Sequence, residues 1–124
     1  MRMNPEVKTR WVAALRSGGY EQGKGYLSLN GEFCCLGVLC ELAVEAGVIG
    51  AATPSDVAHS VMFYGDEDAA RILPWEVMEW SGVYRDNGKF QIDTAAGPSF
   101  TSLSVLNDSG SSFSQIADLI EYHF

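Results

Sequence analysis

The three cysteines are the side chains whose type and position come closest to a catalytic pattern. Cys34 and Cys35 are adjacent, at the junction of a predicted strand and an apolar predicted helix that contains Cys40. Free N–H groups and the helix dipole at such a junction favour the thiolate form of a nucleophilic cysteine. A cysteine hydrolase or transferase also needs a base, and the histidines of the chain are His59 and His123. Neither has a local context that fixes it beside a thiol, so we favour core packing and keep catalysis by Cys34 or Cys35 as the alternative.

The spacing of the cysteines does not fit a metal site or a disulfide framework. Zinc knuckles and ribbons use cysteines separated by two residues, whereas this run is Cys-Cys-x4-Cys. The chain has 3 cysteines, an odd number, and two of them are adjacent, which argues against the paired bridges of a small secreted protein. The sequence therefore predicts no metal, no cofactor and no disulfide framework.

Two polar segments are candidates for ligand binding. Gln22, Lys24 and Tyr26 lie in a glycine-rich connection, where backbone amides and the lysine could cradle a phosphate. Asn107 and Asp108 precede the last predicted helix, where an anionic or hydroxylated ligand could also be held by backbone amides. A flexible connection and an Asx turn explain the same residues without a ligand. We predict these five residues as the ligand-binding set and leave the structural explanation open beside it.

The charge of the chain is uneven. Residues 1–24 carry five basic and two acidic side chains, a net charge of +3, although the whole chain has a formal net charge of −8. The rest therefore carries −11, which repels a phosphate backbone and argues against direct nucleic-acid binding. A basic protein partner is compatible with that surface, and so is a purely solubilising role. The acidic run 66–68 could bind a cation, but we interpret it as a solvated cap, and Trp75 as part of the core.

Length and composition describe an ordinary globular chain. Its 124 residues are 47% hydrophobic and 19% charged, which fits a single compact domain over residues 1–124. No apolar run approaches the roughly 20 residues of a membrane span, and the N-terminus lacks the apolar region of a signal peptide. We therefore expect a cytoplasmic protein without a membrane partner.

Capping signals predict the helices that would position these side chains. Asn4, Pro5 and Glu6 begin a helix that ends at the glycine pair 18–19. The last helix follows a capping box of Ser112 and Gln115. The other helical segments, in order, are a strongly apolar central helix, a short helix and a single turn over residues 36–46, 74–80 and 103–106.

Two Asn-Gly pairs predict two hairpins with type I′ turns. Asn30-Gly31 would pair Leu29 with Glu32, and Asn87-Gly88 would place Asp86 opposite Lys89. The expected strands cover residues 26–29, 32–35, 61–64, 83–86 and 89–92, with a loop over 48–60 and a linker-like stretch over 94–101. The predicted fold class is α+β: a small antiparallel sheet built from hairpins, with the central apolar helix and N- and C-terminal amphipathic helices packed on it.

The order of the motifs resembles a family of small uncharacterised proteins encoded by bacteriophages and prophages. The matching patterns are W-x2-A-L-R-S-G-x-Y-x-Q-G at 11–23, F-C-C-L-G-V-x-C at 33–40, L-P-x-E-V-x2-W at 73–80 and L-N-D-x-G-x2-F-x2-I-A at 106–117. The resemblance implies a phage accessory protein that acts in the host bacterial cytoplasm. It implies no activity and transfers no catalytic residue.

Small size, acidity and the lack of a placed base favour a protein that acts by binding rather than an enzyme. We expect it to modulate a host protein or to sequester a small metabolite or signalling nucleotide, for example in counter-defence, with self-association into a homo-oligomer. The alternatives are a cysteine-dependent hydrolase or transferase using Cys34 or Cys35, and a structural or scaffold protein of the particle.

Overall fold

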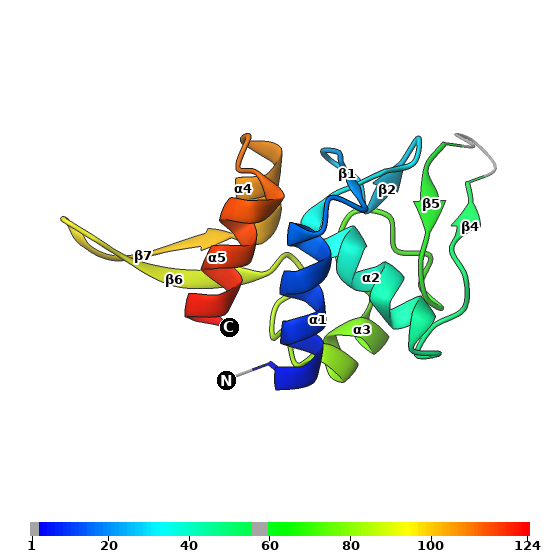
Figure 1. Ribbon diagram of the computed structural model, residues 1–124, viewed down its shortest axis with the longest axis horizontal. Coiled ribbons are helices and arrows are strands. Elements are labelled where there is room, and N and C mark those ends of the chain that lie inside the picture. Colours follow the sequence, from blue (N-terminus) through cyan, green and yellow to red (C-terminus); the bar gives the residue numbers. More distant parts are fainter. Residues whose placement is uncertain (1–2, 56–59) are drawn as a thin grey trace.

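The computed structural model describes residues 3–55 and 60–124, and Figure 1 shows their arrangement. The helices are α1 (Pro5–Arg16), α2 (Cys35–Glu45), α3 (Trp75–Ser81), α4 (Leu103–Asp108) and α5 (Phe113–His123). The strands are β1 (Glu21–Gln22), β2 (Ser28–Leu29), β3 (Glu32–Phe33), β4 (Thr53–Pro54), β5 (Met62–Phe63), β6 (Lys89–Thr94) and β7 (Gly97–Ser102). The candidate base His59 lies outside the described residues. Among the helices described, none has both the length and the apolar character to cross a bilayer.

Helix α1 begins as its capping signals predict. Asn4 Oδ1 accepts from the backbone N–H of Glu6 at 2.9 Å and of Val7 at 3.4 Å, and Pro5 occupies the first turn, where a missing N–H costs nothing. Trp11 is fully buried, and its indole N–H donates to the backbone oxygen of Cys35 at 2.9 Å. This bond joins the middle of α1 to the start of α2.

The C-terminal helix packs along α1, so the two amphipathic helices lie side by side (Figure 1). The predicted capping box is confirmed, since Ser112 and Gln115 each bond the other's backbone N–H. At the exposed edge of the helix pair, Arg16 forms ion pairs with Asp118 and Glu121.

The first predicted hairpin is confirmed. Asn30 and Gly31 have φ values of 54° and 78°, as a type I′ turn requires, and Leu29 pairs with Glu32. The paired strands are shorter than expected, and β1 adds a parallel partner to β3 that the sequence did not suggest. An isolated bridge between Leu29 and Val61 brings β5 beside the hairpin.

Helix α2 is central, as its composition predicts. Eight of its 11 residues are buried, and the helix begins at Cys35, one residue earlier than expected. Gly37 lies so close to the backbone just before β2 that an added Cβ would stand 1.8 Å from the backbone oxygen of Leu27. Only glycine permits this approach, which sets the start of α2 directly against the first hairpin.

The second predicted hairpin is wrong. Asn87-Gly88 does not connect two strands; instead β6 pairs with β7, and the stretch expected to be a linker forms most of β7. Lys89 consequently pairs with Ser102 rather than with Asp86. A tertiary contact explains the difference, because the backbone oxygen of Gly88 accepts from Leu103 N at 3.2 Å. The ring of Phe90 also packs on the ring of His123 at the end of α5, and β6 continues toward its own turn beyond Thr94.

The loop expected over 48–60 is also corrected, since it contains β4, which pairs with β5. The fold class itself is confirmed: helices surround α2, and small sheets, mainly antiparallel, lie on one side of it and in the projecting β6–β7 hairpin (Figure 1).

Candidate functional site

Tertiary structure brings three of the predicted ligand-binding residues together in a group that we call the Asn107 cluster: Gln22, Asn107 and Asp108, with the backbone of 23–25 and of Cys35. Asn107 is fully buried at the end of α4. Its Oδ1 accepts from Gln22 Nε2 at 2.9 Å and from Cys35 N at 3.2 Å. Its Nδ2 donates to the backbone oxygen of Gly23 at 2.7 Å and to Asp108 Oδ1 at 3.2 Å. Two acceptor sites and two donors are the full capacity of an asparagine.

The remaining members of the cluster are also engaged within the protein. Gln22 Nε2 donates a second bond to the backbone oxygen of Ser111 at 2.8 Å, and Gln22 Oε1 accepts from Phe113 N at 3.2 Å. Asp108 Oδ1 accepts from Gly25 N at 3.0 Å. These bonds join β1, the glycine-rich connection and the α4–α5 corner. They give Gln22 and Asn107 a structural role, and the expectation that the cluster holds a ligand stays a prediction.

In the described structure, no hydrogen bond joins the side chain of Lys24 or Tyr26 to the Asn107 cluster. Lys24 is exposed. Tyr26 Oη accepts from Arg71 Nη2 at 3.0 Å, and the guanidinium carbon lies 4.5 Å from the centre of the tyrosine ring. The five predicted residues therefore separate into three that bond to one another or to nearby backbone and two, Lys24 and Tyr26, that lie outside this cluster.

The thiols lie in an environment that suppresses reactivity. Cys34 caps α2, where its sulfur accepts from Gly37 N at 3.4 Å, yet burial raises the pKa of the Cys34 thiol to about 11. Burial likewise raises the pKa of Cys35 and Cys40 well above the ordinary value. The Cys35 thiol donates to the backbone oxygen of Leu103, 3.6 Å away. Loss of hydration outweighs the helix N-terminus here, which agrees with packing as the role of these cysteines.

His123 does not supply a base to these thiols. Its ring packs against Phe90 and Tyr122, with centroid distances of 4.8 Å and 4.7 Å. Over the described residues no group of three or more metal-ligating side chains is suitably placed for a metal ion.

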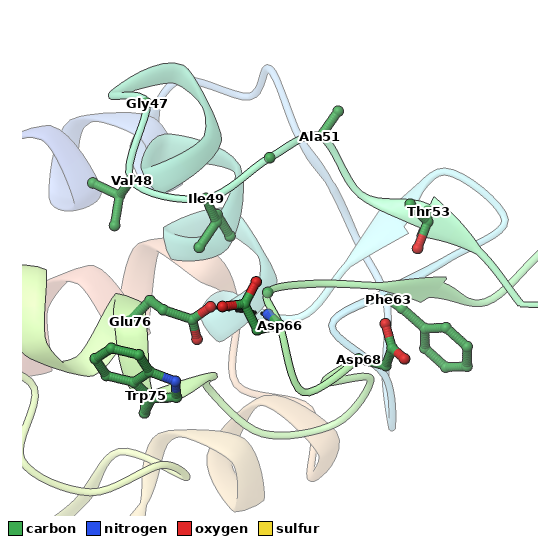
Figure 2. Close-up of a pocket in the computed structure, with 12 residues that line it drawn as sticks. Gly47, Val48, Ile49, Ala51, Thr53, Phe63, Asp66, Asp68, Trp75 and Glu76 are labelled. Carbon is green, nitrogen blue, oxygen red and sulfur yellow. Dashed lines mark hydrogen bonds between the residues drawn. The ribbon is translucent and has the colours of Figure 1, made fainter.

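A hollow of about 580 Å³ lies apart from the predicted residues, and we call it the acidic hollow. One wall is the segment 47–51 that follows α2, and the other runs from the end of β5 to the first turn of α3. Three carboxylates line it, those of Asp66, Asp68 and Glu76. Figure 2 shows Asp66 and Glu76 next to each other in the middle of the hollow, with Ile49 above them and the indole of Trp75 beneath.

The Glu76 carboxylate is fixed in place but incompletely bonded. Its Oε2 accepts from Asp66 N at 2.9 Å, whereas Oε1 is buried and has no partner in the described part of the chain. Gly65, with φ of 73°, makes room for it, because a Cβ there would lie 3.0 Å from Oε1 and 2.9 Å from Pro74 Cβ. The turn therefore holds an acidic group partly away from water.

No basic side chain compensates this charge within the described structure. The ion pairs found there are those of Arg16 with Asp118 and Glu121, on α1 and α5. The hollow also presents Trp75, which is 51% exposed rather than part of the core as expected. An exposed indole face attracts cations, so carboxylates and ring together favour a positively charged group.

Sequence reasoning missed the acidic hollow. The pattern of the acidic run 66–68 is typical of a solvated cap, and nothing in the local sequence marks Trp75 or Glu76 for binding. The available signal was weak: a glycine before the acids, and a Trp-Glu pair directly after Pro74. Only the fold places that helix start against the acidic turn.

Fold and site together define a small α+β protein with an acidic hollow beside an exposed tryptophan. Residues 3–124 match the family described as Domain of unknown function (DUF8296), and the chain belongs to that family. No significant match was found among curated proteins or among solved structures.

Proposed function

We propose that the protein acts by binding and that the acidic hollow receives a cationic side chain of a partner protein. The observation that carries the proposal is the Glu76 carboxylate, held at the hollow with one buried oxygen unbonded in the described structure. A partly buried charge without a counter-charge lowers stability. A lysine or arginine side chain in the hollow would supply that counter-charge.

The shape and walls of the hollow support the same kind of ligand. Its volume of about 580 Å³ exceeds what one side chain fills, so a short piece of partner backbone would also fit. Ile49 and Trp75 offer apolar surface for the methylene stem of a basic side chain, while the carboxylates take its charged end. The net charge of −8 would attract a basic protein over longer distances.

The likeness to small phage proteins suggests the biological setting. In this proposal the chain is a phage accessory protein in the host bacterial cytoplasm, and its partner is a basic surface of a host protein. Binding to such a surface would modulate the host protein without any chemistry by the chain. The buried thiols with raised pKa values give the alternative cysteine enzyme no support.

A titration with amino-acid probes tests the proposal. Isotope-labelled protein is titrated with N-acetyl-lysine amide and with the same compound neutralised by acetylation at Nζ, while the indole N–H signal of Trp75 is followed by NMR. We expect the cationic probe to shift this signal and the neutral probe to leave it in place. The variant Glu76→Gln should weaken binding at least about fivefold.

The matched control is Glu67→Gln, which removes the same charge from an exposed side chain in the same turn. Glu67 does not line the hollow, so its loss should change the affinity by less than about twofold. Equal binding of the two probes, or equal weakening by the two variants, would contradict a site at Glu76.

A further inference from the structure

A second hollow, of about 510 Å³, lies between α2, the first hairpin and β5. The side chains that matter for its chemistry are Phe33, Glu41, Val44, Met62 and Tyr64. Glu41 is one of two acidic residues on the mainly apolar α2, and no described basic group forms an ion pair with it. Like the acidic hollow, this one therefore has a carboxylate without a counter-charge.

Tyr64 holds the Glu41 carboxylate in a defined position. The tyrosine is 1% exposed, and its Oη donates to Glu41 Oε2 at 2.7 Å. Burial and the neighbouring carboxylate raise the pKa of Tyr64, so its hydroxyl remains a donor. One hydrogen bond uses a small part of the acceptor capacity of a carboxylate. Glu41 is thus oriented from one side and open to a donor from the hollow.

The two hollows share a wall. Successive side chains of a strand point to opposite faces. Along β5 and its continuation, Met62 and Tyr64 line the second hollow, whereas Phe63 and Gly65 line the acidic hollow. Ala51 lines both. The two hollows therefore meet at Ala51, which is exposed, and a partner segment that passes over this residue can reach carboxylates on both sides of the wall.

We propose that one partner segment fills both hollows with two cationic side chains, one at Glu76 and the other at Glu41. This inference rests on the proposed function and specifies the partner as a segment with two basic residues. Phe33, Val44 and Met62 form apolar walls along which the stem of the second basic side chain packs, with its charged end at Glu41. Two linked contacts give an affinity that neither contact reaches alone.

The test uses peptides with two lysines separated by roughly one to six glycines, each compared with a peptide whose second lysine is acetylated at Nζ. At the spacing that matches the two hollows, the doubly charged peptide should bind at least about tenfold more tightly than its singly charged partner. Glu41→Gln should abolish this gain, so that the doubly charged peptide binds no more tightly than its singly charged partner. Glutamine keeps an oxygen for Tyr64 Oη, so the variant is expected to fold, and thermal melting checks this.

Glu45→Gln is the matched control, because Glu45 is exposed one turn further along α2 and does not line the second hollow. It should preserve the gain. Binding of the singly charged peptide without any gain at every spacing would overturn this inference and leave the proposed function intact. A gain lost equally in both variants would also overturn it. Failure of every cationic peptide to bind would overturn the proposed function and this inference with it.

Discussion

The Asn107 cluster and the acidic hollow each contain a central polar side chain, Asn107 or Glu76, that the fold holds wholly or partly away from water, but the two side chains end in opposite states. In the cluster, Asn107 uses all its donors and acceptors on Gln22, Asp108 and nearby backbone. In the hollow, Glu76 has one bond from the Asp66 backbone and one buried oxygen without a partner in the described structure. A buried polar group stabilises a fold when its bonds are complete and costs stability when they are not.

This difference indicates which region is structural and which is available for binding. A closed network resists any ligand, because a ligand would have to replace bonds that already exist. An uncompensated carboxylate gains from a cation, and sites of this kind are commonly kept at some cost to stability. Function is therefore expected where the polar bonding is incomplete.

The largest expected effect is that of Asn107→Ala, which removes the central side chain of the fully bonded Asn107 cluster. The change leaves Cys35 N and the Gly23 backbone oxygen without their side-chain partner and removes one of the two bonds of Gln22 Nε2, so it should lower the free energy of unfolding by about 4 kcal/mol. Urea unfolding followed by circular dichroism measures it. The control Asp108→Asn keeps the oxygen that accepts from Gly25 N and should cost less than about 1 kcal/mol. A loss below about 1 kcal/mol for Asn107→Ala would remove the structural role given to the cluster.

Thiol labelling tests whether the cluster region is inert. The pKa of Cys34 is raised to about 11, so near pH 8 its thiolate fraction should be about a hundredfold below that of an ordinary thiol. Iodoacetamide should therefore modify the native protein slowly and the urea-unfolded protein fast, as mass spectrometry can follow. The same shift makes stability depend on pH. The pKa of Cys34 is higher in the folded than in the unfolded protein, so the free energy of unfolding falls as pH rises from about 9 to about 11. Rapid labelling of Cys34 or Cys35 in the native state at pH 6 would contradict this expectation and favour the alternative that the protein is a cysteine-dependent enzyme.

The variant Glu76→Gln tests the acidic hollow, and it should change the free energy of unfolding in the opposite direction to Asn107→Ala. Glutamine keeps an oxygen for Asp66 N and removes a partly buried charge beside two other acids, so we expect a gain of about 1 kcal/mol in the free energy of unfolding. Urea unfolding at pH 7 measures the gain. If the variant instead loses 1 kcal/mol or more, the carboxylate stabilises the fold, and the contrast between the two regions disappears.

The smallest effect is expected for Glu67→Gln, which sharpens the contrast by separating position from charge. Glu67 is exposed in the same acidic turn and makes no hydrogen bond or ion pair in the described structure. Its replacement should leave the free energy of unfolding within about 0.5 kcal/mol of the original. A stabilisation equal to that of Glu76→Gln would show that total charge, and not the hollow, is responsible.

Features that depend on neighbours in sequence were predictable. The start of α1 at Asn4 and Pro5, the capping box at Ser112, and the turn at Asn30-Gly31 each depend on residues within one helical turn or one hairpin loop. The same kind of signal failed at Asn87-Gly88. There a bond from Leu103 N to Gly88 O, between residues distant in sequence, directs the chain into β6 and leaves the hairpin turn to residues beyond Thr94.

The sequence by itself determined the α+β class, the apolar central helix, the capped terminal helices and the acidic charge, because these follow from composition and local spacing. It also named Gln22 and Asn107, but only tertiary structure, which joins side chains 85 positions apart at 2.9 Å, decided that they bond to each other. Tertiary structure likewise decided that Glu76 lies against the turn at Asp66 with an oxygen unbonded in the described structure. Whether a polar group is satisfied depends on what the whole fold places around it, and local sequence does not contain that information.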